Sequence, residues 1–152
     1  MSLMEPYQLF SDLVHAEVRL YNALDRRLRA DHGLAASQHA MLRFIEATDG
    51  CRVADIAREM VIAVGAASKS VDRLESSGWV VRRPNPENRR SSLLELTQSG
   101  RSLLAQASVT ADAEVRHWLG SALTEPELAQ LAVALGRVLS TLYSAGIGQP
   151  TG

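Results

Sequence analysis

Four arginines lie close together in the stretch VVRRPNPENRRSSLLELT, which covers residues 80–97. Arg82 and Arg83 precede a turn rich in proline and asparagine, and Arg89 and Arg90 follow it. Four permanent positive charges on one short segment would attract a polyanion. An isolated charged turn in solvent would have the same composition, so the interpretation depends on the neighbouring elements.

The distribution of charge along the chain supports the polyanion interpretation. The 152 residues have a formal net charge of -1, but residues 51–92 carry +3, whereas residues 1–50 and residues 93–152 carry -2 each. This pattern predicts a basic binding module between two acidic segments that have another task.

The composition predicts one globular domain without a membrane segment. The hydrophobic content is 46%, and charged residues interrupt every long apolar window. The start, MSLMEPYQLF, has no basic leader and no apolar signal core. Together with a single cysteine, Cys51, which cannot form an internal disulfide, this predicts a cytoplasmic protein. With no basic cluster beside it in sequence, Cys51 is expected to be an ordinary thiol rather than a redox sensor.

Residue types used in catalysis and metal binding show no recognisable spacing. The histidines at positions 15, 32, 39 and 117 are scattered, and the chain has no G-x-S-x-G nucleophile motif, phosphate-binding glycine loop or dinucleotide fingerprint. We therefore expect no enzymatic activity, no metal site and no cofactor.

Hydrophobic periodicity predicts helices on both sides of the basic region. Leucines at spacings of four and seven indicate a long amphipathic helix over about 7–30, which Gly33 would end. Ser37 is the expected N-cap of a second helix. Thr97 would cap a helix to about residue 119. A T-x-x-E capping box at residues 124–127 then precedes a final helix with an apolar repeat at Leu128, Leu131, Leu135, Val138 and Leu142.

The central segment predicts two short helices followed by a hairpin. The first helix covers residues 53–60, with an inner face of Ala54, Ile56, Ala57 and Met60. The second covers residues 64–77, with an inner face of Val64, Ala67, Val71 and Leu74. Residues 79–81 and 91–96 favour strands on either side of the proline-rich turn.

Two short helices and a basic hairpin in this order form a winged helix-turn-helix. The expected fold class is mainly α with a small β-hairpin wing and long helices at both ends. A helix fits the major groove of B-DNA, and a hairpin tip can reach the adjacent minor groove, where arginine is favoured. We therefore predict that the helix contacts DNA through Gly65, Ala66, Ser68, Lys69 and Arg73, and the wing through Arg82, Arg83, Asn88, Arg89 and Arg90. For Lys69 and Arg73 the alternative is pairing with Asp72 or Glu75 on the same helix.

The segments DIAREM and SKSVDRLESSGWVVRRPNPENRRSSLLELTQSG resemble the MarR family of bacterial transcriptional regulators over about residues 35–100. The family pattern combines a helix ending in D-R-L-E-x-x-G, a wing with D-P-x-D-R-R and a following L-T-x-x-G. The resemblance implies that residues 64–77 form the recognition helix and that Arg89 enters the minor groove. Asn85 and Asn88 stand where the family has aspartates, so a hydrogen bond without charge assistance would replace an ion pair at the wing.

The resemblance also implies a homodimer in which the first, fifth and sixth helices interlock. The chain would then be one structural domain with a dimerisation helix (1–34), a winged DNA-binding lobe (35–100), two further dimerisation helices (101–146) and a flexible tail (147–152). The expected partners are double-stranded DNA, a second copy of the chain and a small-molecule effector, with no membrane.

The expected function is repression at a pseudo-palindromic operator, with release by a small aromatic or phenolic effector. His39 and Trp118 are the candidates for an effector pocket between the dimerisation helices and the winged lobe, because each combines a flat apolar body with a polar edge. Core packing is the alternative for Trp118. A helical small-molecule-binding protein and a dimeric interaction module without DNA binding are the competing functions. The sequence identifies neither the operator nor the effector.

Overall fold

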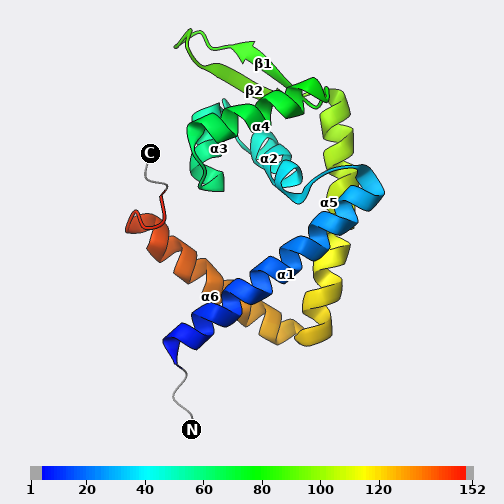
Figure 1. Ribbon diagram of the computed structural model, residues 1–152, viewed down its shortest axis with the longest axis vertical. Helices are drawn as coiled ribbons and strands as arrows, with labels where there is room; N and C mark the ends of the chain where they lie inside the picture. Colours follow the sequence, from blue (N-terminus) through cyan, green and yellow to red (C-terminus); the bar gives the residue numbers. More distant parts are fainter. Residues whose placement is uncertain (1–4, 150–152) are drawn as a thin grey trace.

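The chain folds into helices and one two-stranded hairpin. A computed structural model describes residues 5–149, so part of the tail predicted at 147–152 lies outside the described residues. In chain order the elements are α1 (Pro6–His32), α2 (Ala36–Ala47), α3 (Val53–Met60), α4 (Val64–Ser76), β1 (Val80–Pro84), β2 (Ser92–Leu96), α5 (Gln98–Ala122) and α6 (Glu125–Ser144). Figure 1 shows α2, α3, α4 and the hairpin gathered at one end of the molecule, while α5 leads away from it to α6. This arrangement is the predicted winged helix-turn-helix with long helices at both ends.

One apolar core holds the winged lobe together. Every element from α1 to α5 contributes to it, and its largest fully buried side chains include Leu28, Leu34, Leu42, Ile56, Val71 and Leu74. Closely packed apolar side chains of this kind fix the orientation of the elements that carry them. The outer surface of α4 is therefore presented from a rigid base.

The start of α2 differs from the prediction, because Ala35 rather than Ser37 is the N-cap. Asp25 Oδ1 of α1 accepts a hydrogen bond from the Ala36 N–H at 2.8 Å, and Gln38 Oε1 accepts one from the Ala35 N–H at 2.9 Å. Gln38 thus satisfies the N–H of the N-cap residue and Asp25 that of the first helical residue, so two N–H groups at the helix start have side-chain acceptors although the N-cap is an alanine. The bond from Ala36 and the neighbouring Arg29 lower the pKa of the Asp25 carboxyl. The helix start is thus capped partly by its own first turn and partly by a side chain of α1.

The inner faces of α3 and α4 are smaller than predicted. Ala54 and Val64 are exposed, and the buried positions are Ile56, Ala57, Ala67, Val71 and Leu74. The whole first turn of α4, residues 64–66, is exposed, so the contact of this helix with the core begins only at Ala67. Between the two helices, Val61 has a left-handed backbone with φ 55° and ψ 48°.

The hairpin is anchored at its base to both neighbouring helical segments. β1 and β2 are antiparallel, with Arg82 opposite Leu94 and Arg83 opposite Leu93. The Leu94 N–H donates a hydrogen bond to the carbonyl of Cys51 at 2.8 Å, which ties β2 to the loop before α3. Thr97 caps α5 as predicted, because its Oγ1 accepts a hydrogen bond from the Gly100 N–H at 3.0 Å.

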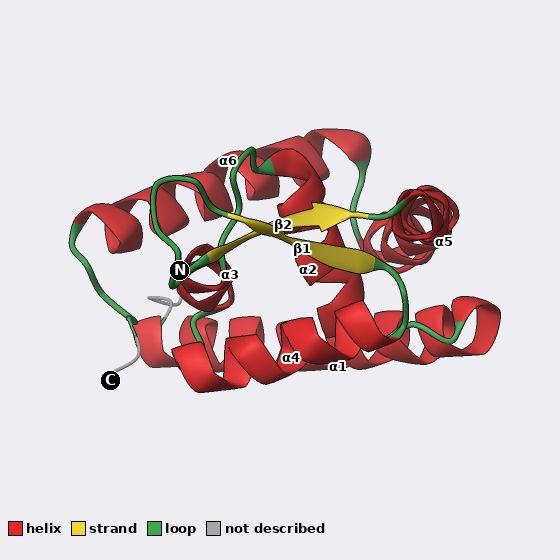
Figure 2. Ribbon diagram, turned by 90° about the horizontal axis from the view of Figure 1, so that it is seen from above, coloured by secondary structure: helices red, strands yellow, loops and turns green. Residues whose placement is uncertain are grey.

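Apolar side chains lie exposed on the helices outside the lobe. The predicted capping box at the start of α6 is confirmed, with the Thr124 N–H donating to Glu127 Oε2 at 2.8 Å, but no residue of α6 is buried. The exposed apolar residues include Leu9, Phe10, Leu13, Val14 and Val18 of α1 and Leu131, Val138, Leu139, Leu142 and Tyr143 of α6. In Figure 2, seen from above, α1 and α6 lie on opposite sides of the molecule. Across residues 5–149, no helix has the length and apolar character needed to cross a membrane.

Candidate nucleic-acid interface

The outer face of α4 carries the residues that the sequence predicted for DNA contact. Because Ala67, Val71 and Leu74 point into the core, the opposite face is left to solvent. Gly65, Ala66, Lys69 and Arg73 are exposed on it, and Ser68 is half-buried. The predicted set therefore shares one accessible helix face, with small residues near its N-terminal end and two basic residues further along.

The acidic neighbours of Lys69 and Arg73 pair with the wing rather than with these two residues. Arg82 Nη2 of β1 lies 2.6 Å from Asp72 Oδ1, and Arg82 Nε lies 3.7 Å from Glu75 Oε1. The alternative that Lys69 and Arg73 pair with Asp72 or Glu75 is therefore wrong. No ion pair within the described part of the chain involves Lys69 or Arg73.

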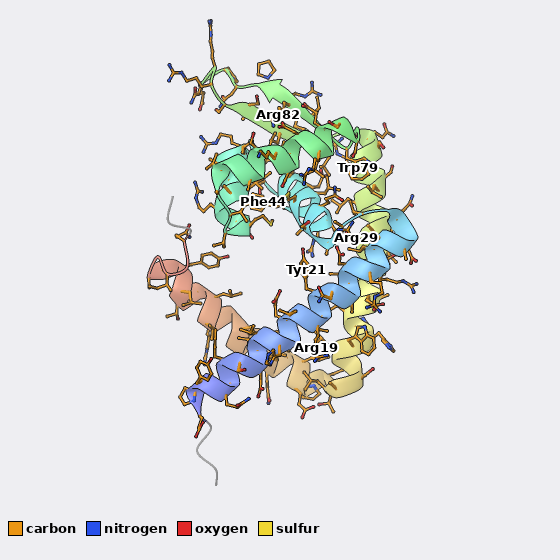
Figure 3. All side chains as sticks on the ribbon, viewed as in Figure 1. Arg19, Tyr21, Arg29, Phe44, Trp79 and Arg82 are labelled. Atoms are coloured by element: carbon orange, nitrogen blue, oxygen red, sulfur yellow. The ribbon has the colours of Figure 1, made fainter. Side chains whose placement is uncertain are left out.

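Arg82 serves as a brace between the wing and α4. Its side chain is 25% exposed, and its backbone N–H also donates a hydrogen bond to Glu75 Oε2 at 3.3 Å. Figure 3 shows the labelled Arg82 where the hairpin passes over α4. A guanidinium held by two carboxylates is less available to a phosphate than a solvated one. Among the four wing arginines, Arg82 is thus the one most committed to protein contacts.

Arg83 makes a single cross-strand ion pair. Its Nε lies 2.7 Å from Glu95 Oε2 of β2, and both side chains are about half exposed. Exposed pairs of this kind contribute little to stability and exchange readily with water and other anions. Arg83 therefore remains accessible to an anion near the turn end of the two strands.

The two asparagines of the wing organise its turns. Asn85 Oδ1 accepts a hydrogen bond from the Glu87 N–H at 3.0 Å, and Asn85 Nδ2 donates one to Ser91 Oγ at 3.0 Å. Asn88 Oδ1 accepts one from the Arg90 N–H, also at 3.0 Å. These are the bonds by which asparagine side chains close tight turns. The side-chain oxygen of Asn88 thus binds a backbone N–H, at a position where the family pattern has an aspartate.

Arg89 and Arg90 project from the tip of the wing. Both are exposed, and neither takes part in an ion pair within residues 5–149. An unpaired, exposed guanidinium on a narrow hairpin has the shape and charge needed to enter a minor groove. The geometry leaves these two arginines as the free charges of the wing.

A separate cavity of about 580 Å³ lies between α2, α3 and α5. Its lining combines apolar side chains with charged groups and a hydroxyl, and includes Arg43, Phe44, Glu59, Met60, Leu104 and Ser108. Neither His39 nor Trp118 is among the lining residues. Sequence reasoning missed this set because its members come from three separate helices and share no motif.

His39 and Trp118 occupy very different surroundings. His39 is buried, 5% exposed, with Nε2 at 3.2 Å from Ser108 Oγ, and burial lowers the pKa of its imidazole. Ser108 belongs to the cavity lining, so His39 lies directly behind the cavity wall. Trp118 is 48% exposed on α5, and its indole N–H donates to Glu114 Oε1 at 2.8 Å. The core-packing alternative for Trp118 is therefore wrong.

Within residues 5–149 no group of three or more histidine, cysteine, aspartate or glutamate side chains could hold a metal ion. The one cysteine, Cys51, is fully buried, and burial raises the pKa of its thiol to about 11.

Comparisons with known proteins agree with this geometry. The family model described as MarR family matches residues 32–91. The multiple antibiotic resistance protein MarR of Escherichia coli is 29% identical over 106 residues, which are 70% of this chain and 74% of that protein.

Solved structures match almost the whole fold. A mutant MarR of Escherichia coli complexed with operator DNA has a TM-score of 0.76 at 27% identity, and the match covers 91% of this chain and 99% of the other. The transcriptional repressor CouR bound to a 23-mer DNA duplex has a TM-score of 0.78 at 25% identity, with the same coverage.

Proposed function

This chain belongs to the MarR family of DNA-binding transcriptional regulators, and from that premise we propose that it acts as a homodimeric repressor of a pseudo-palindromic operator. In this proposal α4 enters the major groove, and the wing tip reaches the adjacent minor groove. A small aromatic or phenolic effector releases the protein from its operator.

One observation supports the DNA-binding surface more than any other. Arg82 pairs with the carboxylates of Asp72 and Glu75, which are the two acidic residues of α4. Lys69 and Arg73 on the helix and Arg89 and Arg90 on the wing are then the charges that remain free. A protein with a net charge of -1 thereby presents a locally basic surface to a polyanion.

The dimer is supported by the apolar surface outside the winged lobe. α6 has no buried residue, although its sequence repeats leucine and valine with the spacing of a packed helix. Apolar stripes of this length on α1 and α6 are typical of a surface that a partner chain covers. Two lobes held by such an interface would address two half-sites at a fixed distance.

Effector control is supported by the position of the cavity between α2, α3 and α5. α2 and α3 belong to the lobe that carries α4, whereas α5 leads away to α6. A ligand seated there would favour one orientation of the lobe over another, and so one spacing of the two α4 helices. Arg43 could bind the carboxylate or phenolate of an aromatic ligand, and Phe44, labelled in Figure 3, could pack against its ring.

Selection of bound sites from random duplex DNA tests the proposed function. We expect the selected sites to share an inverted repeat, and binding to weaken steeply as the salt concentration rises. Absence of any duplex that binds with this salt dependence would contradict DNA binding itself. For the effector, a panel of aromatic carboxylates and phenols should raise the melting temperature and weaken DNA binding, and Ser108→Leu, which fills the cavity, should abolish both effects.

A further inference from the structure

A second, polar pocket lies between the C-terminal end of α1, the start of α2 and one flank of α4. Its volume is about 240 Å³, and its lining includes Arg29, Ser37, Gln38, Met41, Ser70 and Arg73. Two guanidinium groups from segments far apart in the sequence thus meet at one pocket. No carboxylate and no aromatic ring lines it, so its chemistry suits a compact anion better than an aromatic ligand or a base.

Both arginines keep donors for such an anion. Arg29 pairs with Asp25 through Nε at 2.7 Å, and within residues 5–149 its terminal Nη1 and Nη2 make no hydrogen bond. Asp25 is held in place by a second bond, because its other oxygen accepts from the Ala36 N–H at 2.8 Å. This carboxylate orients the Arg29 side chain from behind the pocket without lining it. Arg73 takes part in no ion pair over the same range.

The pocket lies on the flank of α4 away from the wing. Asp72 and Glu75 face Arg82 and the hairpin on one flank, whereas Ser70 and Arg73 line the pocket on the other. A helix about 10–12 Å in diameter fills a major groove about 12 Å wide, so the two DNA backbones pass along its two flanks. One backbone would meet the wing, and the other would meet this pocket. Figure 3 shows the labelled Arg29 near the end of α1 that adjoins the lobe.

We propose that this pocket binds a backbone phosphate of the operator between Arg29 and Arg73, so that α1 contributes directly to DNA binding. The phosphate oxygens accept from both guanidinium groups and from the hydroxyls of Ser37 and Ser70. The inference rests on the proposed DNA-binding function and adds to the recognition surface a helix that sequence analysis assigned to dimerisation alone. The contact carries no base information, and it fixes the register of α4 in the groove.

The test compares Arg29→Gln with Arg27→Gln as a matched control. Arg27 is also an exposed α1 arginine with an i,i+4 ion pair, to Asp31 at 2.9 Å, but it does not line the pocket. Because Arg73 stays at each of the two pockets of the dimer, the loss of Arg29 should reduce the magnitude of the salt slope by at most about 1.8 and the affinity by at most about 30-fold near 0.15 M salt, on operator and unrelated duplexes alike. Arg27→Gln should bind like the wild type. Equal behaviour of the two variants would overturn the inference.

Two further measurements separate the contact from a structural effect and from a free anion. Asp25→Asn keeps an oxygen for the Ala36 N–H and retains Arg29, but removes the carboxylate oxygen that orients the Arg29 side chain, so its affinity for DNA should fall by clearly less than that of Arg29→Gln. A loss as large as that of Arg29→Gln would show that the α1–α2 junction, not a phosphate contact, matters. Inorganic phosphate, followed by NMR of the Arg29 and Arg73 side chains, should bind only weakly, and submillimolar binding would assign the pocket to a free anion.

If wild-type protein binds no duplex, the proposed function fails; if it binds and Arg29→Gln matches Arg27→Gln, only this inference fails.

Discussion

Arg82 Nη2 lies 2.6 Å from Asp72 Oδ1, and this ion pair joins the first strand of the wing to the exposed face of α4. Asp72 would otherwise place an unpaired negative charge beside Lys69 and Arg73. A pair with one partner this exposed contributes about 0.2–1 kcal/mol to folding. Its main effect should therefore be on the charge that α4 presents to DNA, and only secondarily on stability.

The first prediction follows from that pair. Arg82→Ala should weaken binding to every duplex by about tenfold, because it removes a cation and exposes the carboxylates of Asp72 and Glu75 to phosphate repulsion. Adding Asp72→Asn to this variant should restore part of the affinity, although it adds no positive charge. Fluorescence anisotropy at several salt concentrations measures both effects. No recovery in the double variant would contradict the proposed electrostatic role of the pair.

The second prediction concerns two arginines of the wing: over residues 5–149, Arg89 takes part in no ion pair, whereas Arg83 is paired with Glu95. Arg89→Ala should lose the preference for sites with a narrow, A·T-rich minor groove, and Arg89→Lys should restore it poorly because an ammonium is more strongly hydrated. Arg83→Ala should instead lower affinity for all duplexes to a similar degree. Competition binding between A·T-rich and G·C-rich flanks distinguishes the two patterns. Unchanged affinity and groove preference in Arg89→Ala would show that the tip of the hairpin does not contact DNA.

Much of the fold could be predicted because its signals are local. The helices that the hydrophobic period indicates, the glycine after α1 and the caps at Thr97 and Thr124 each depend on a few neighbouring residues, and the structure confirms them. The start of α2 could not be predicted, because its N-cap is an alanine and one of its two side-chain acceptors is Asp25, eleven residues upstream on another helix. The local preference for serine at an N-cap therefore predicted Ser37, whereas the helix begins earlier, where a tertiary contact from Asp25 bonds the Ala36 N–H.

The site shows the same division between local and distant information. The outward face of α4 follows from helical periodicity, so its small and basic residues could be predicted to lie together. The partner of Asp72 could not, since composition alone gives equal reason to pair it with Lys69, Arg73 or a wing arginine. The choice of Arg82 depends on where β1 crosses α4. The meeting of Arg29 with Arg73 likewise depends on the packing of α1 and carries no sequence motif.

The third prediction tests the dimer. Leu135 belongs to the apolar repeat of α6, whereas Val133 lies on the opposite side of the same helix and is 60% exposed. Leu135→Asp should dissociate the dimer and abolish operator binding together, because one lobe engages only a half-site. Val133→Asp adds the same charge to the other face and should leave both properties intact. Analytical ultracentrifugation and anisotropy on the same samples decide the matter, and a dimeric, DNA-binding Leu135→Asp protein would contradict the proposed interface.

The fourth prediction concerns the thiol of Cys51. It is fully buried, and burial raises its pKa to about 11, so roughly one molecule in a thousand carries the thiolate at pH 8. Native protein should therefore react with iodoacetamide far more slowly than the same protein in denaturant. Peroxide at concentrations that oxidise exposed thiols should leave DNA binding unchanged. Rapid alkylation of the folded protein, followed by mass spectrometry, would show that the lobe opens at the loop before α3.

The last prediction concerns Val61, the residue that ends α3 with a left-handed backbone at φ 55°. A β-branched side chain is unfavourable in this region by about 1–2 kcal/mol, whereas asparagine adopts it readily. Because Val61 is 45% exposed, Val61→Asn gives up little apolar burial and should raise the free energy of unfolding by about 1 kcal/mol. Val64→Asn is the control, since Val64 is similarly exposed but lies in the right-handed helix α4, where the same replacement should change stability by less than about 0.5 kcal/mol. Urea unfolding of both variants at one fixed protein concentration keeps the contribution of dimer dissociation the same in the two measurements. If Val61→Asn gains no more stability than Val64→Asn, the turn between α3 and α4 stores no strain, and the valine is accommodated there without cost.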